Sequence, residues 1–422
     1  MAGMLDLRFI RENQAAVRRA IQAKQMPEAV LALDRLLLVD EEYRILKRDL
    51  EEGQAQRNAN ARLVGQLKRE GRDAAELMSA MSALSDEVKR LQTQLDALSL
   101  EIPNLPHESV PYGVTEHDNV VFKEWGVKRD FGFAPAPHWD ILTSHGWVDF
   151  DAGVKVAGAG FPVFKGTGSR LVRALRNYFL DRLDAAGYSE IVPPLMVNAA
   201  SATATGQLPD KEGQMYEVTD GFFLIPTSEV PVTNVHRDEI LDQAALPIKY
   251  TAFTPCFRRE AGSHGKDVRG LNRVHQFDKV EMVQFVAPEE SYAALEEMTR
   301  HSEALLEELG LPYRRLLMCT GDLGFTQAKK YDLEVWSPGQ ERWLEVSSIS
   351  NMEAFQANRL RTRARPGGAA GKGKTEVVHT LNGSALAFPR TIAALVETYQ
   401  EQDGSVTVPT ALRPYLGADS LR

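Results

Sequence analysis

Residues of the kinds that handle phosphate groups and metal ions recur in the second half of the chain. Arg258 and Glu260 precede a glycine-rich loop, and Arg390 ends a run of small residues that enters a predicted helix. A guanidinium group is planar and always charged, which suits it to phosphate oxygens. Glutamate carboxylates and serine hydroxyls, which also occur there, are oxygen ligands that a hard cation such as Mg²⁺ accepts. These types favour chemistry on a phosphate compound, in which a protein positions groups and stabilises charge.

The composition is that of an ordinary globular protein. The chain has 422 residues, of which 43% are hydrophobic and 25% charged, with a formal net charge of −9. Nucleic-acid binding would therefore have to use local basic patches. No apolar run approaches the roughly 18 residues of a membrane span, and the N-terminus lacks a signal-peptide core. Two cysteines exclude a disulfide framework and a four-cysteine zinc site, so we expect a cytoplasmic protein without zinc.

A long helical hairpin is predicted at the N-terminal end. Residues 28–69 contain no proline, and apolar residues recur at alternating spacings of three and four from Leu36 to Leu50. After a turn at residues 70–72 the repeat continues from Ala74 to Leu98. A repeat of about 3.5 residues is typical of supercoiled helices. We expect an antiparallel coiled-coil arm of roughly 60 Å in a domain of residues 1–110, which prolines close.

Basic residues gather where the arm is expected to turn. Between positions 54 and 72 five of them stand against one acidic residue, Glu70; they are Arg57, Arg62, Lys68, Arg69 and Arg72. Such a run is most often a solvated face. The alternative is a tip that contacts nucleic-acid phosphates. The residue pattern alone leaves both interpretations open.

Residues 111–422 show the pattern of an α+β domain. Helices are predicted at residues 169–186, 289–309 and 390–400, the first with Ser169 as its cap and Gly187 as its stop. Strands are predicted at residues 188–192, 222–225, 248–253, 273–286, 333–336, 342–349 and 377–380. Because they do not alternate regularly with helices, a mainly antiparallel sheet flanked by helices is favoured. Residues 368–375 match the sequence pattern G-x-x-x-x-G-K-T of a nucleotide-binding loop. No apolar strand is predicted before them and no helix after them, and such a loop needs both.

Three segments resemble, in order, the signature motifs of class II aminoacyl-tRNA synthetases: residues 187–194, 257–281 and 382–390. Residues 227–229, 275–281 and 345–351, behind a helical hairpin, make the chain similar to the bacterial-type seryl-tRNA synthetases. The resemblance covers essentially the whole chain. It implies a class II catalytic domain at residues 111–422. It also implies activation of serine with ATP to seryl-adenylate and pyrophosphate, and transfer of serine to the terminal ribose of tRNA.

The resemblance also implies roles for individual residues. Arg258, Arg390 and Glu281 would be catalytic, with Arg258 at the α-phosphate and Arg390 at the far end of the triphosphate. Serine would be bound by Thr227, Ser228, Glu229, Arg258, Glu281 and Ser384. ATP would be bound by Arg258, Arg259, Glu260, Val274, Phe277, Glu345, Val346, Ser347, Ser348 and Arg390, and Mg²⁺ by Glu345 and Ser348. Ala385 and Pro389 stand where many relatives have glycine, and Ala385 is expected to narrow the pocket slightly.

Single residues would not support these roles. An isolated Phe277 would most often be a core residue, and an isolated Arg–Glu pair a surface salt bridge, so the agreement of several motifs carries the interpretation.

The implied partners are serine, tRNA and a second copy of the chain, with no membrane. The arm would recognise the shape and backbone of serine tRNA; whether selenocysteine tRNA is also charged stays open. The first motif implies a symmetric homodimer. A tRNA-binding protein that no longer activates serine, a ligase that charges a carrier protein and a coiled-coil scaffold are less favoured. The chain has the arm, about 300 residues beyond it, and all of Arg258, Glu281, Glu345 and Arg390.

Overall fold

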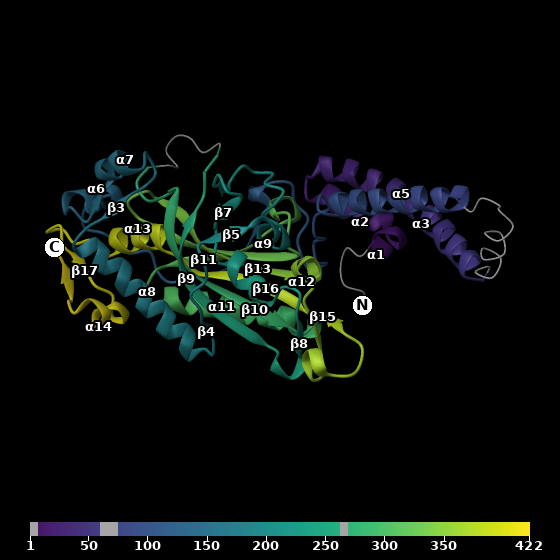
Figure 1. Ribbon diagram of the computed structural model, residues 1–422. Helices are drawn as coiled ribbons and strands as arrows, with labels where there is room; N and C mark the ends of the chain where they lie inside the picture. The colour runs from purple at the N-terminus through teal and green to yellow at the C-terminus, as the bar shows by residue number, and fades with distance from the viewer. Residues whose placement is uncertain (1–6, 60–74, 262–268) are drawn as a thin grey trace. The chain divides into compact units, whose positions relative to one another are not determined.

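The computed structural model describes residues 7–59, 75–261 and 269–422, and it divides into two compact units, Met1–Leu105 and Pro106–Arg422 (Figure 1). The division falls among Pro103, Pro106 and Pro111, the prolines that were expected to close the arm. Within the described ranges, no helix combines the length and apolar character needed to cross a membrane.

The first unit is helical. Two short helices, α1 (Leu7–Glu12) and α2 (Gln14–Ala23), precede the long helices α3 (Pro27–Ala59) and α5 (Ala75–Ser99). The predicted seam joins the long helices, because Leu36, Leu91 and Leu95 are fully buried in one apolar cluster. Val17 and Ile21 of α2, a helix that was not predicted, belong to the same cluster. The predicted turn at residues 70–72 lies outside the described residues.

The second unit is built on an eight-stranded sheet with the strand order β1-β11-β12-β13-β16-β10-β9-β4. Its strands are β1 (Val120–Trp125), β4 (Ser189–Glu190), β9 (Ile248–Phe257), β10 (Gln276–Val286), β11 (Tyr313–Leu317), β12 (Lys329–Ser337), β13 (Arg342–Glu353) and β16 (His379–Ala387). All neighbouring pairs are antiparallel except β4 and β9, which run parallel. The prediction of a mainly antiparallel sheet is confirmed.

Smaller strands and the helices surround this sheet. The small strands are β2 (Val148–Asp149), β3 (Val163–Phe164), β5 (Met196–Asn198), β6 (Tyr216–Glu217), β7 (Phe222–Leu224), β8 (Ile240–Asp242), β14 (Arg363–Arg365), β15 (Glu376–Val377), β17 (Val406–Thr407) and β18 (Ser420–Leu421). The helices are α6 (His138–Ser144), α7 (Phe150–Val156), α8 (Thr167–Ala185), α9 (Ala199–Ala204), α10 (Glu229–Thr233), α11 (Ser291–Glu308), α12 (Ala354–Leu360), α13 (Phe388–Thr398) and α14 (Arg413–Leu416).

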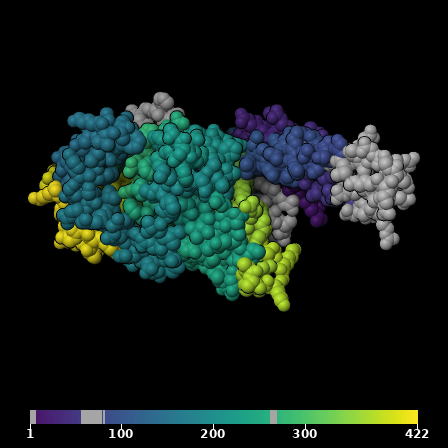
Figure 2. Space-filling model, viewed as in Figure 1, coloured from purple at the N-terminus to yellow at the C-terminus, as the bar shows by residue number. Residues whose placement is uncertain are grey.

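The main core lies between the sheet and the helices α8, α11 and α13. Phe179, Leu306 and Ile392, one from each helix, have no exposed surface and belong to one cluster with Val280 and Met282 of β10. Side chains alternate across a strand, so the neighbouring residues of β10 are left to face the opposite side of the sheet. The C-terminal segment, yellow in Figure 2, lies against α8 through α14.

Two local predictions differ from the structure. The predicted cap of α8 is wrong, because the helix begins at Thr167 after Gly166 (φ +51) and Ser169 instead donates its hydroxyl to Phe164 O at 2.9 Å. Gly187 does end this helix, with φ +84. The predicted strand at 377–380 is two strands, and the second continues to Ala387. Its small polar residues are weak strand formers, which hid this extension from the sequence pattern.

Candidate active site

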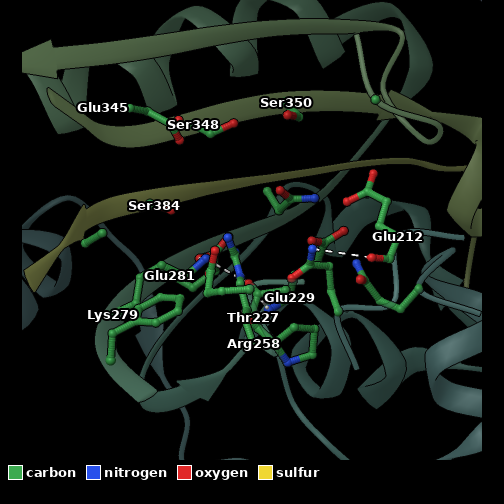
Figure 3. Close-up of a pocket in the computed structure, with 18 of the residues that line it drawn as sticks. Glu212, Thr227, Glu229, Arg258, Lys279, Glu281, Glu345, Ser348, Ser350 and Ser384 are labelled. Atoms are coloured by element: carbon green, nitrogen blue, oxygen red, sulfur yellow. Dashed lines mark hydrogen bonds and ion pairs between the residues drawn. The ribbon is translucent and has the colours of Figure 1, made fainter. Parts of the chain in front are cut away.

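A cavity of about 460 Å³ opens over β10, β13 and β16 of the second unit (Figure 3). Strand pairing builds its floor, because Glu281 of β10 lies opposite Ser384 of β16, and Gly383 of β16 lies opposite Ile349 of β13. A Cβ atom at Gly383 would lie 2.8 Å from the Ile349 side chain, so β16 can pass β13 this closely only with glycine there.

Most of the predicted site residues line this one cavity. They are Thr227, Glu229, Arg258, Glu260, Val274, Phe277, Glu281, Glu345, Val346, Ser347, Ser348, Ser384 and Arg390. Figure 3 shows Glu345 and Ser348 on one strand, facing Thr227, Glu229 and Glu281 across the strand that carries Ser384. Segments that are more than 150 residues apart in the sequence thus meet at one surface.

Two predicted binding residues do not line the cavity. Ser228 is fully buried, and its hydroxyl lies 2.6 Å from Thr254 Oγ1. Arg259 lies beyond the cavity wall, where its main-chain N–H donates to Gln214 O at 2.9 Å. Both directly follow a residue that does line the cavity, and Ser228 has the helical backbone with which α10 begins.

Two further expectations concern residues away from the cavity. Ala385 does not narrow the pocket, because it has no exposed surface and belongs to the main core. The basic residues Arg62, Lys68, Arg69 and Arg72 lie outside the described residues, as does the side chain of Arg57.

One end of the cavity, which we call the acidic end, holds the carboxylates of Glu229 and Glu281. Lys279 forms an ion pair with Glu281 and donates from Nζ to Thr227 Oγ1 at 2.8 Å. The main-chain N–H of Glu229 donates to the same Thr227 oxygen at 3.3 Å. Because two donors occupy this oxygen, the hydroxyl proton of Thr227 is the part left for a ligand.

Glu229 titrates near neutral pH. Burial and the neighbouring Glu281 raise the pKa of Glu229 to about 7. Gln356 holds its side chain, donating from Nε2 to Glu229 Oε1 at 2.6 Å and accepting from Thr380 Oγ1 at 2.8 Å. A cation that binds beside Glu229 would favour its ionised form.

The other end, which we call the phosphate end, carries two arginines. Arg258 donates from Nε to Pro226 O at 3.2 Å, and its guanidinium lies 5.2 Å from the centre of the Phe277 ring. Arg390 donates from Nε to Asn272 O and from Nη1 to Glu345 O, both at 2.9 Å. Main-chain carbonyl oxygens thus hold both guanidinium groups in the cavity, where their charge is available to an anion.

The residues at the phosphate end fit Mg²⁺. Partial desolvation in the cavity works against ionisation of Glu345, whose side chain is about half exposed, but Arg390 and Lys330 lower the pKa of this carboxyl below its usual value. Ser348 lines the cavity beside it, and Asp332 faces Ser348 from β12. No cluster of three or more His, Cys, Asp or Glu side chains suited to a metal occurs in the described ranges. Two oxygen ligands suit a Mg²⁺ ion that also takes phosphate oxygens and water.

The cavity lining also contains residues that were not predicted, among them two polar residues of the floor strands, Lys279 and Asn382. Lys279 lies two residues before Glu281, so the alternation of β10 places both on the same face. Asn382 lies two residues before Ser384 on β16 and is buried, with no hydrogen-bond partner for its Nδ2 atom. Once β10 and β16 are assigned as strands, the same two-residue period identifies both.

Comparisons with known proteins agree along the whole chain. The model of the class II tRNA synthetase core domain (G, H, P, S and T) matches residues 215–399. The model of the seryl-tRNA synthetase N-terminal domain matches residues 4–106.

Individual relatives match over their full lengths. The serine–tRNA ligase of Salinibacter ruber is 52% identical over 98% of each chain, and that of Bacillus subtilis is 49% identical over 98% of each chain. The structure of seryl-tRNA synthetase from Pyrococcus horikoshii, complexed with ATP, matches with a TM-score of 0.92 at 37% identity and covers 99% of both chains. The chain therefore belongs to the seryl-tRNA synthetase family, class II ligases that use ATP to join serine to tRNA.

Proposed function

We propose that the cavity activates serine with ATP and that both substrates bind in it at once. The observation that supports this most directly is the pairing of an acidic end with a phosphate end inside one space of about 460 Å³. An amino acid at one end and a nucleotide at the other would bring the serine carboxylate to the α-phosphate. Holding two reactants in this way removes much of the entropic barrier to their reaction.

The acidic end would bind serine. Glu281 and Glu229 accept hydrogen bonds from the ammonium and hydroxyl groups, with Ser384 across the floor from Glu281. Thr227 donates its hydroxyl proton to a serine oxygen, and Arg258 pairs with the carboxylate. A site that hydrogen-bonds a hydroxyl group rejects alanine and glycine far more strongly than apolar contact does.

The phosphate end would bind ATP. Phe277 stacks on adenine, and Glu260 lies near the polar edge of the base. Arg258 and Arg390 hold the α-phosphate and the far end of the triphosphate, and Val274, Val346 and Ser347 complete the wall. Mg²⁺, held by Glu345 and Ser348, would neutralise part of the triphosphate charge.

The reaction then follows from positioning. The serine carboxylate attacks the α-phosphate, a new P–O bond forms, and pyrophosphate leaves with the electron pair of the broken bond. In the second step a terminal ribose hydroxyl of tRNA attacks the seryl carbonyl and releases AMP. We propose that the adenylate phosphate takes the hydroxyl proton.

The first unit would bind tRNA, as we propose for Arg57, Arg62, Lys68, Arg69 and Arg72. Deleting residues 30–97 should abolish charging of serine tRNA and leave serine-dependent ATP–pyrophosphate exchange largely intact. Equal loss of both activities would contradict this role. The same charging assay with selenocysteine tRNA would show whether that tRNA is also a substrate.

The second unit would form a homodimer in the cytoplasm. Exposed apolar side chains follow α8, namely Val192, Leu195, Met196 and Phe222. An apolar set of this kind suits a self-complementary interface. Cys256 and Cys319 are both buried free thiols, which suits a reducing compartment. Sedimentation at micromolar concentration would test the dimer.

The decisive experiment for activation is ATP–pyrophosphate exchange with serine, threonine, alanine, glycine and cysteine. Exchange with serine alone is the expected result. If the folded protein bound tRNA but showed no exchange with any of the five, the function would be tRNA binding without activation.

A further inference from the structure

The wall of the phosphate end includes a short segment, residues 271–274, each of which contributes to the cavity lining. Two of its hydrogen bonds lead away from the cavity, and a third joins it to Arg390 in the cavity wall. The Leu271 N–H donates to His138 Nε2, the Asn272 amide donates to Gln340 Oε1, and the Asn272 carbonyl accepts from Arg390, each at 2.9 Å. The segment is thus held from behind by His138 and Gln340, which take no part in the proposed reaction, and it is joined to Arg390, which does.

His138 is buried together with Glu397, and neither has exposed surface. Because the Leu271 N–H donates to Nε2, this nitrogen is an acceptor and the imidazole proton lies on Nδ1. The Nδ1–H donates to Glu397 Oε1 at 2.8 Å, and so does the main-chain N–H of His138.

Further donors surround the Glu397 carboxylate. They are the Ser337 hydroxyl, the Gly339 N–H at 3.1 Å and Gln340 Nε2 at 3.3 Å. A buried carboxylate without an arginine or lysine partner needs such donors to replace water. The number of bonds fixes Glu397, and through it the orientation of the His138 ring.

These hydrogen bonds connect helix α13 to residues 271 and 272 by two routes. Glu397 and Arg390 both lie on α13, seven residues or about two turns apart. From Glu397 one path runs through His138 to Leu271, and the other runs through Gln340 to Asn272 and on to Arg390. Gly270 (φ +66) lets the ring lie close to the main chain, since a Cβ atom there would be 2.4 Å from His138 Nε2.

We propose that His138 and Glu397 are positioning residues for the nucleotide: they set the place of residues 271–274, and with it the direction of Arg390. This inference rests on the proposed ATP site. It predicts that the pair affects ATP affinity, with little effect on serine binding at the far end of the cavity.

A pair of substitutions at His138 separates the two hydrogen bonds of its ring. Asparagine in His138→Asn keeps a donor at the Nδ1 position and loses the acceptor that reaches Leu271. Glutamine in His138→Gln keeps an oxygen that reaches Leu271. We expect H138N to raise both the KM for ATP in serine-dependent pyrophosphate exchange and the Kd for ATP in calorimetry about tenfold, the effect of one hydrogen bond. H138Q should restore most of the affinity, and the KM for serine should change less than twofold in either variant.

Two further variants keep the test decisive. His145→Asn is the matched control, because His145 lies just after the other end of α6 and does not line the cavity; its half-buried ring stacks on Trp147 and bonds Gly404 O. If H138N does not fold, Gln340→Met, in a partly exposed turn, removes the bonds of Gln340 to Asn272, Glu397 and Ser337 but leaves the His138–Leu271 bond in place, and it should raise the Kd for ATP about threefold.

Unchanged ATP affinity in folded H138N and Q340M would overturn the inference. A parallel rise in the KM values for ATP and serine, with a lowered melting temperature, would overturn it as well. A wild-type protein that binds ATP but lacks serine-dependent exchange would refute the proposed function instead, and calorimetry would still test the positioning role.

Discussion

The two ends of the cavity are built differently. At the acidic end Glu229, Lys279 and Glu281 are 7%, 5% and 2% exposed, and each contacts another protein side chain. At the phosphate end the side chains of Arg390 and Glu345 are 28% and 48% exposed, and Arg390 is held mainly by carbonyl oxygens. In the proposed function, the acidic end would therefore select a small ligand through fixed, desolvated hydrogen bonds, whereas the phosphate end would attract a large one through charge.

Removing the Glu281 charge should have the largest effect. Glu281→Gln leaves Lys279 buried without its partner and removes an acceptor for the serine ammonium. We expect kcat/KM for serine to fall roughly thousandfold in pyrophosphate exchange, with ATP affinity within threefold of wild type. Glu303→Gln is the control, since Glu303 is a buried glutamate paired with Lys123 away from the cavity. An equal loss of ATP affinity in E281Q would show that the two ends are not separate.

Removing Arg390 should have the next largest effect, at the opposite end. Arg390→Ala removes a charge that the triphosphate would meet, so kcat/KM for ATP should fall about hundredfold while serine affinity stays unchanged. Arg129→Ala is the matched control, because Arg129 also donates to two carbonyl oxygens, those of Thr398 and Gln400, but does not line the cavity. Calorimetry with ATP and with serine would measure the two affinities separately. A larger loss of serine affinity than of ATP affinity in R390A would contradict the assignment of Arg390 to the phosphate end.

Removing Lys279 tests whether its contacts at the acidic end contribute to serine binding. Lys279→Met leaves Glu281 without its counter-charge and frees an acceptor on Thr227. The KM for serine should rise about 30-fold, because both groups must then be reorganised before they bind the ligand. Lys249→Met, which removes an ion pair to Glu297 elsewhere on the second unit, should leave it unchanged. If K279M and wild type had the same KM for serine, Lys279 would have no part in the site.

The smallest effect is a pH dependence that belongs to one end only. With its pKa raised to about 7, Glu229 is protonated in the empty protein below pH 7 and must ionise to accept the serine ammonium. The value of kcat/KM for serine should thus be level above pH 7 and fall up to about tenfold per unit below it. Glu229→Gln should remove this slope. A slope of the same size in kcat/KM for ATP would assign the titration to another group.

The sequence predicted more of the site than of the elements that form it. Motif residues such as Glu281 and Arg390 were found because their spacing is shared with a family, and these residues do line the cavity. Ser228 shows the limit of this approach, since a contiguous motif does not tell which side chain points inward. Lys279 could have been found from the two-residue period of the predicted strand 273–286, whereas Asn382 was missed because its own strand was predicted to end at residue 380 and β16 continues to Ala387.

The arm shows the opposite case. Its seam could be predicted from periodicity alone, because Leu36, Leu91 and Leu95 repeat at helical spacing and pack within one unit. The short helices α1 and α2 could not, because neither is long enough to show a repeat. Local periodicity thus predicts helices that pack on their neighbours, while contacts between distant strands need the three-dimensional structure.

Strand β10 has a consequence for how this chain can change in length. Phe277, Lys279 and Glu281 line the cavity from alternate positions of one strand, so the proposed nucleotide and serine sites share the same backbone. Insertion or deletion of a single residue there would turn all later side chains over, sending Glu281 into the core and Val280 or Met282 into the cavity. A point substitution in β10 alters one contact at a time. A one-residue insertion or deletion before Phe277 would shift the register of the strand and disable both ends of the cavity together.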